Sequence, residues 1–132
     1  DNLGKSVLYE VDETKKICTI TLNTPGKMNS MTPDVIQGAC AAIAMAASDP
    51  DLRVVILTGA GKAFCAGGDV KGMAGQRPNK KGGAKRKPRP VPMDAGVWGL
   101  RADSYSSELL RNMSKVTIAA INGACAGAGL SW

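Results

Sequence analysis

The chain has 132 residues, enough for one domain with a hydrophobic core, and its 44% content of apolar residues excludes a disordered or fibrous protein. The net charge of +6 comes from one segment, because residues 77–89 carry seven positive charges and the rest of the chain therefore sums to −1. The overall charge is for this reason no argument for a nucleic-acid-binding protein.

The chain has four cysteines and no histidine. None of the cysteines forms a C-x-x-C pair, and each lies in an apolar or glycine-rich segment of the kind that holds buried thiols: Cys18, Cys40, Cys65 and Cys125. We expect neither a metal site nor disulfides, and we expect a reducing, cytoplasmic location. We also expect no signal peptide and no association with a membrane, because the first residues are polar and the apolar runs are short.

Two segments at the start of the chain alternate apolar and polar residues. They are SVLYEVD (residues 6–12) and KICTITLN (residues 16–23), and the polar turn between them predicts a β-hairpin. A loop, NTPGKMNSM, follows. A helix is predicted to begin after Thr32, a good N-cap residue followed by Pro33, and to end before Pro50.

The next elements predict an α/β fold with a parallel sheet. LRVVILTG (residues 52–59) is nearly continuous in apolar residues, which predicts a strand buried on both faces and reached by a right-handed crossover. Residues 76–95 are rich in Pro, Gly, Lys and Arg, so we expect a flexible basic insertion. A second helix is predicted within residues 98–115, and a second buried strand over residues 116–123.

The last residues, from Gly127 to Trp132, predict the first turn of a further helix. A domain seldom ends with its last strand uncovered and its last helix barely begun. We therefore expect the chain to be part of a longer domain.

The two predicted parallel strands run into similar segments of small residues. VVILTG continues into AGKAFCAGGD, and VTIAAING continues into ACAGAG. Small residues at the carboxyl end of a strand let backbone N–H groups approach a ligand. Two such ends can direct two N–H donors at one oxygen, as in an oxyanion hole. Taken singly, each segment is equally explained as a tight turn between a strand and a helix.

Two other glycine-rich sites do not fit these residues. GAGKAF resembles the end of a phosphate-binding P-loop, but Ile56 stands where the P-loop has its first glycine. Ala63 stands where the P-loop has Ser or Thr. The G-x-G-x-x-G pattern of dinucleotide sites is absent at both strand ends.

The motif F-C-A-G-G-D after VVILTGAGKA, the later motif AAINGACAGAG and the early loop TLNTPGKMNSMT occur in one chain. In combination they resemble the signature segments of the enoyl-CoA hydratase/isomerase (crotonase) superfamily. The resemblance implies a crotonase-like spiral of ββα units, incomplete here, with residues 1–132 as the N-terminal part of one domain. It also implies hydration or double-bond isomerisation of an enoyl-CoA, assembly into a homotrimer or hexamer, and coenzyme A bound only as part of the substrate.

The resemblance assigns roles to residues in and near these motifs. The backbone amides of Gly68 and Ala128 would form the oxyanion hole that stabilises a thioester enolate. Ala66 and Gly67 would lie beside coenzyme A, and Lys27 is a candidate partner for its phosphates.

One residue departs from the family's pattern. Hydration in this family resembles two-glutamate chemistry, in which one carboxylate activates water and the other handles the α-proton. The position of the first glutamate is Ser131 here, and the chain has no histidine to activate a serine. This favours isomerisation with a single carboxylate over hydration, and it leaves open a catalytically inactive acyl-CoA-binding or assembly protein.

The basic insertion opens a third class, a nucleic-acid-binding protein. No aromatic residue lies within residues 77–89, so bases would have no side chain on which to stack. We expect this segment to be solvated or to attract the phosphates of coenzyme A.

Overall fold

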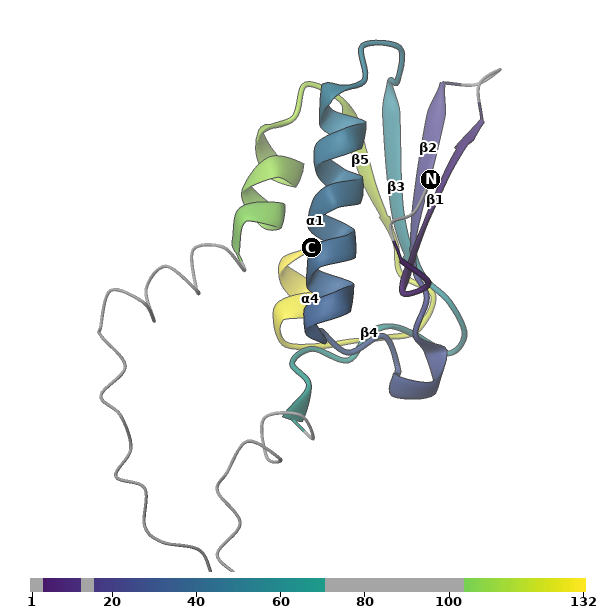
Figure 1. The fold of residues 1–132 in the computed structure, drawn as a ribbon, viewed down its shortest axis with the longest axis vertical. Helices are drawn as coiled ribbons and strands as arrows, with labels where there is room; N and C mark the ends of the chain where they lie inside the picture. Colours follow the sequence, from purple (N-terminus) through teal and green to yellow (C-terminus); the bar gives the residue numbers. More distant parts are fainter. Residues whose placement is uncertain (1–3, 13–15, 71–103) are drawn as a thin grey trace, which may run out of the picture.

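The computed structural model describes residues 4–12, 16–70 and 104–132. Four strands form one sheet in the order β1-β2-β3-β5 (Figure 1). Their bounds are β1 Val7–Asp12, β2 Ile17–Leu22, β3 Val54–Gly59 and β5 Val116–Ala120. The pair β1 and β2 is antiparallel, whereas β2 with β3 and β3 with β5 are parallel. This confirms the predicted hairpin and the predicted parallel sheet.

Helix α1 (Pro33–Ser48) packs on β1 and β2 and forms the core with them. Its buried face consists mainly of small residues: Val35, Gly38, Ala39, Ala42, Ile43 and Ala46. Short side chains on this face favour close packing of the helix on the sheet. The sheet contributes buried Val7, Cys18, Ile20 and Leu22 to the same cluster. The predicted N-cap is confirmed, since the Thr32 hydroxyl accepts a hydrogen bond from the Val35 amide at 3.4 Å.

Two predictions of burial need correction. In β3, Val55 and Leu57 are buried toward the core, but Val54 and Ile56 on the other face are only half-buried. In β5 all five residues are exposed, and Val116 retains 60% of its accessible surface. The difference fits the position of β5, which is the edge strand of this sheet and pairs only with β3 among the described residues. An apolar run predicts a strand but does not state how many neighbours the strand has.

A second, two-stranded parallel sheet was not predicted. It pairs β4 (Ala63–Cys65) with β6 (Ala124–Cys125), which follow β3 and β5 after short connections. Helix α4 (Ala128–Ser131) comes directly after β6 and contacts β4, which confirms the predicted helical turn.

The second predicted helix is described over residues 104–112. This segment and the residue after it pack against the core through Leu109, Leu110 and Met113. The predicted basic insertion at residues 76–95 lies outside the described residues. In the part of the chain that the structure describes, no helix is long and apolar enough to cross a membrane.

Candidate functional site

The two glycine-rich segments that follow the parallel strands lie beside each other. We call them the first loop (residues 65–68) and the second loop (residues 126–129). The pairing of β4 with β6 brings them together, and the Ala126 amide donates a hydrogen bond to the Cys65 carbonyl oxygen at 3.0 Å. A Cβ atom added to Gly127 would lie 3.5 Å from the Cα atom of Gly67. The two strand ends singled out in the sequence therefore lie side by side.

Glycines make this close approach possible. Gly67 has φ +88° and Gly127 has φ +56°, both in the left-handed region that side chains disfavour. A Cβ atom on Gly67 would lie 2.9 Å from the Ala126 carbonyl oxygen, and one on Gly129 would lie 2.6 Å from the Cβ atom of Cys65. Any larger residue would push the two loops apart.

A third segment, residues 28–31, fixes the first loop from the other side. The Ala66 amide donates to the Met28 carbonyl at 3.0 Å, and the Met31 amide donates to the Gly67 carbonyl at 2.8 Å. Met31 and Gly68 form an isolated parallel bridge. In this bridge Met31 binds the residue before Gly68, so the Gly68 amide is not used to hold the loop.

Among the described residues, the two predicted donor amides have no hydrogen-bond acceptor, and both belong to exposed residues. Among the described residues, no backbone or side-chain group accepts a hydrogen bond from the amide of Gly68 or Ala128. Ala128 is the first residue of α4, where a helix has no internal partner for the N–H group. Both residues are exposed. Gly68 and Ala128 thus each carry an N–H group without a partner among the described residues, and they lie on neighbouring loops.

The other predicted site residues differ in burial. Ala66 is half-buried and Gly67 is buried. Lys27 is exposed on the 3-10 helix η1 (Pro25–Lys27), one residue before the Met28 carbonyl that holds Ala66. Ser131 is exposed in the last turn of α4.

The Cys65 side chain is buried beside Gly129 of the second loop. Burial raises the pKa of this thiol, the nearby Cys125 raises it further, and a hydrogen bond from the Gly67 amide acts in the opposite direction. The first effect is the largest, so Cys65 is a neutral packing residue and not an ionised nucleophile. Within the described residues, no group of three or more His, Cys, Asp or Glu side chains could hold a metal ion.

Sequence reasoning missed two asparagines next to this site. Asn29 is fully buried in the segment between Met28 and Met31, and Asn122 lies just before β6. Their only signal in the sequence was an amide side chain in the early loop, KMNSM, and another at the end of an apolar run, AAING.

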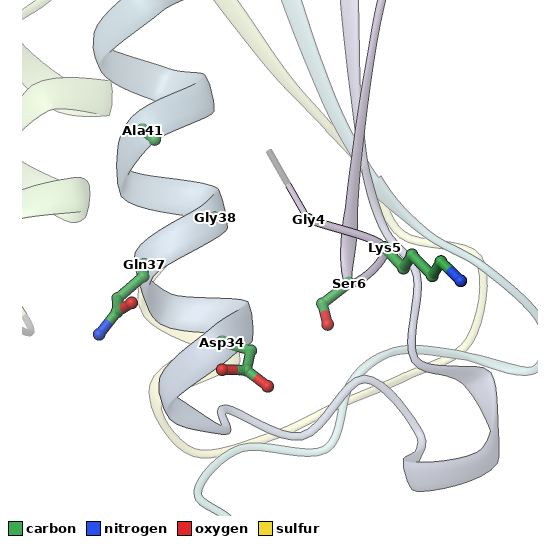
Figure 2. A pocket seen from close by; sticks show the side chains of 7 residues that line it. All are labelled: Gly4, Lys5, Ser6, Asp34, Gln37, Gly38 and Ala41. Carbon is green, nitrogen blue, oxygen red and sulfur yellow. The ribbon is translucent and has the colours of Figure 1, made fainter. Parts of the chain in front are cut away.

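A hollow on the surface lies elsewhere, between the start of the chain and the first half of α1 (Figure 2). It is open and is lined by Gly4, Lys5, Ser6, Asp34, Gln37, Gly38 and Ala41. Figure 2 shows Lys5 and Gln37 extending away from one another, so their polar ends do not converge on a common point. The hollow includes none of the predicted site residues.

Comparison with known proteins agrees with this geometry. The family model for enoyl-CoA hydratase/isomerase matches residues 12–132. A protein named probable enoyl-CoA hydratase EchA14 from Mycobacterium tuberculosis is 36% identical over 125 residues, 95% of this chain and 42% of the relative. The 3-hydroxyisobutyryl-CoA hydrolase 1 of Arabidopsis thaliana is 30% identical over 124 residues, 90% of this chain and 29% of the relative.

Solved structures show the same fold. An enoyl-CoA hydratase/isomerase from Xanthobacter autotrophicus Py2 superimposes with a TM-score of 0.77 at 29% identity, covering 96% of this chain and 42% of that one. The enoyl-CoA hydratase from Bacillus anthracis gives a TM-score of 0.73 at 27% identity, covering 96% of this chain and 43% of that one. The predicted crotonase-like fold is confirmed, and the chain spans less than half the length of these relatives.

Proposed function

Because the chain belongs to the enoyl-CoA hydratase/isomerase family, we propose that it supplies the oxyanion hole of an enzyme acting on acyl-CoA thioesters. The amides of Gly68 and Ala128 donate hydrogen bonds to the thioester carbonyl oxygen as it becomes an enolate. The observation that carries this proposal is the pair of unpaired, exposed amides on two adjoining loops.

The physical reason is the cost of the negative charge. Removing a proton next to a thioester carbonyl places charge on its oxygen, and fixed N–H dipoles stabilise that charge without having to reorient. One such donor typically contributes roughly 3 kcal/mol to the transition state. In the proposal, Ala66 and Gly67 lie beside coenzyme A, and the exposed Lys27 approaches its phosphates.

The reaction we favour is double-bond isomerisation of an enoyl-CoA in fatty-acid-type metabolism. Ser131 stands where the resemblance places the first of two hydration carboxylates, and the first turn of α4 holds no acidic residue. Isomerisation needs one carboxylate to move a proton, so the loss of the first is tolerated. The carboxylate that moves the proton is not among the residues of these loops.

A catalytically inactive acyl-CoA-binding or assembly protein is the second candidate, and the same Ser131 favours it. Such a protein would bind acyl-CoA without turning over enoyl-CoA. We propose assembly into a homotrimer or hexamer in either case. A cytoplasmic location is also part of the proposal, since Cys18 and Cys65 are buried thiols.

Replacing Gly68 by proline tests the oxyanion hole, because proline removes the amide hydrogen while Gly68→Ala keeps it. We expect Gly68→Pro to lower the affinity for acetyl-CoA about tenfold relative to free coenzyme A in titration calorimetry. In a longer protein that carries this chain, we expect turnover of 2- or 3-enoyl-CoA to fall about 10²-fold to 10³-fold.

Circular dichroism and thermal melting show whether each variant keeps its fold. Gly68→Ala should behave as the unsubstituted chain in both measurements. If Gly68→Pro folds and retains full turnover and full preference for acetyl-CoA, the oxyanion assignment is wrong. Acyl-CoA binding without turnover in the longer protein would favour the second candidate.

A further inference from the structure

The Ala63 carbonyl oxygen, at the start of β4, accepts hydrogen bonds from two side-chain amides. The Asn29 Nδ2 atom donates to it at 2.8 Å, and the Asn122 Nδ2 atom donates to it at 3.4 Å. Each amide also donates to a second carbonyl in the turn before β4, Asn29 to Ala60 at 2.9 Å and Asn122 to Gly61 at 2.9 Å. A carbonyl oxygen has two lone pairs, so both donors are accommodated.

Both asparagines are also held by their oxygen atoms. The Asn29 Oδ1 atom accepts from the Thr24 amide at 2.8 Å, and the Asn122 Oδ1 atom accepts from the Gly59 amide at 3.2 Å. Each side chain is thus fixed at both ends, and neither can rotate without breaking bonds to the backbone.

Each asparagine belongs to a segment that touches one of the two donor loops. Asn29 lies between Met28 and Met31, whose backbone binds Ala66 and Gly67 of the first loop. Asn122 precedes β6, and β6 is followed by the second loop, which contains Ala128. The Ala63 carbonyl therefore joins the segment that holds the first loop to the segment that continues through β6 into the second loop.

The backbone around this point is closely packed. A Cβ atom on Gly59 would overlap the Ala63 carbonyl oxygen, and one on Gly123 would overlap the Lys62 carbonyl oxygen. Overlap with backbone atoms cannot be relieved by rotating a side chain. A side chain at Gly59 or Gly123 would therefore require the backbone around the Ala63 carbonyl to move.

We propose that Asn29 and Asn122 are positioning residues that fix the Gly68 and Ala128 amides relative to each other through the Ala63 carbonyl. The inference rests on the proposed function, because the two amides matter only if they bind one oxygen. An oxyanion hole stabilises charge through donors that are already in place before the reaction. Neither asparagine touches the substrate in this proposal.

Aspartate substitutions test this inference. Asn29→Asp and Asn122→Asp keep the size and the acceptor oxygen but remove the amide donors. Asn23→Asp is the matched control, because the Asn23 Nδ2 atom also donates to a backbone carbonyl, that of Lys5 at 3.0 Å, outside the site.

The first readout is amide hydrogen exchange in the unliganded 132-residue chain. The amides of Ala66, Met31 and Ala126 hold the donor loops, and we expect their exchange to become about tenfold faster in Asn29→Asp and Asn122→Asp. The amides of β2 should stay protected, which separates a loosened site from an unfolded chain. Asn23→Asp should leave all three site amides unchanged.

The second readout separates the thioester from the rest of coenzyme A. We expect both site variants to lose about tenfold in affinity for acetyl-CoA while their affinity for free coenzyme A stays the same. A general loss of structure would instead lower the affinities for acetyl-CoA and for free coenzyme A by the same factor.

Unchanged exchange of the three site amides in both Asn29→Asp and Asn122→Asp would overturn the inference. If buried Asn29→Asp does not fold, the exposed Asn122→Asp decides alone. If the unsubstituted chain shows no preference for acetyl-CoA over coenzyme A, the proposed function fails. The exchange measurement still decides whether the asparagines hold the loops.

Discussion

At the scale of single residues, four positions at the candidate site require glycine, two for their backbone conformation and two for lack of space. Gly67 and Gly127 adopt left-handed backbone conformations, while Gly59 and Gly123 lie against backbone atoms of the turn before β4 and of β4 itself. The sequence showed that glycines gather here, but only the structure distinguishes those needed for conformation from those needed for space.

Gly123→Ala tests whether a glycine is needed at this position for lack of space. Its Cβ atom would overlap the Lys62 carbonyl oxygen, so we expect the free energy of unfolding to fall by roughly 1–3 kcal/mol in urea denaturation. Gly26→Ala is the control, since a Cβ atom there meets no atom within 4 Å, and its effect should stay within about 0.5 kcal/mol. Equal stability of the two variants would contradict the crowding of Gly123 against the Lys62 carbonyl.

At the scale of elements, α1 begins where its local sequence indicates. The Thr32 hydroxyl caps the helix, and the neighbouring Met31 amide binds the Gly67 carbonyl, so the start of the helix and the first loop share one segment. The cap stabilises the start of α1, and this start is next to the residue that binds the first loop.

Thr32→Ala should lower the free energy of unfolding by about 1 kcal/mol, because it leaves the Val35 amide without its side-chain acceptor. Thr32→Ser keeps the hydroxyl and should remain near the unsubstituted value. The midpoint of urea denaturation measures both. A Thr32→Ala chain as stable as Thr32→Ser would show that the hydroxyl contributes nothing.

The strands were predicted with unequal success, and the reason is physical. β1, β2 and β3 have alternating or apolar runs that local patterns reveal. β4 and β6 have only three and two residues, and their pairing joins positions about sixty residues apart. Strands this short give no local sequence pattern from which they could be predicted. The burial of β5 was predicted wrongly because burial depends on neighbours and not on composition.

At the scale of the whole molecule, the charge is concentrated in residues 77–89. We expect these residues to attract the phosphates of coenzyme A, so its dissociation constant should rise between about 50 and 200 mM salt. Deleting residues 77–89 should flatten this dependence, and a scrambled segment of the same composition should restore it. Calorimetry at several salt concentrations measures the slope.

If the salt dependence persists in the deletion variant, other cations such as the exposed Lys27 hold the phosphates. Tight, salt-sensitive binding of RNA that disappears with the same deletion would instead favour the nucleic-acid alternative.

The sequence by itself determined the α/β fold, the start of α1 and the two glycine-rich loops, because these follow from hydrophobic period, capping residues and backbone freedom. Only the tertiary structure decided that the two loops adjoin and that β5 is exposed. It also revealed that Asn29 and Asn122 share the Ala63 carbonyl. These features arise from contacts between residues far apart in the chain, and such contacts leave no period or spacing in the sequence to read.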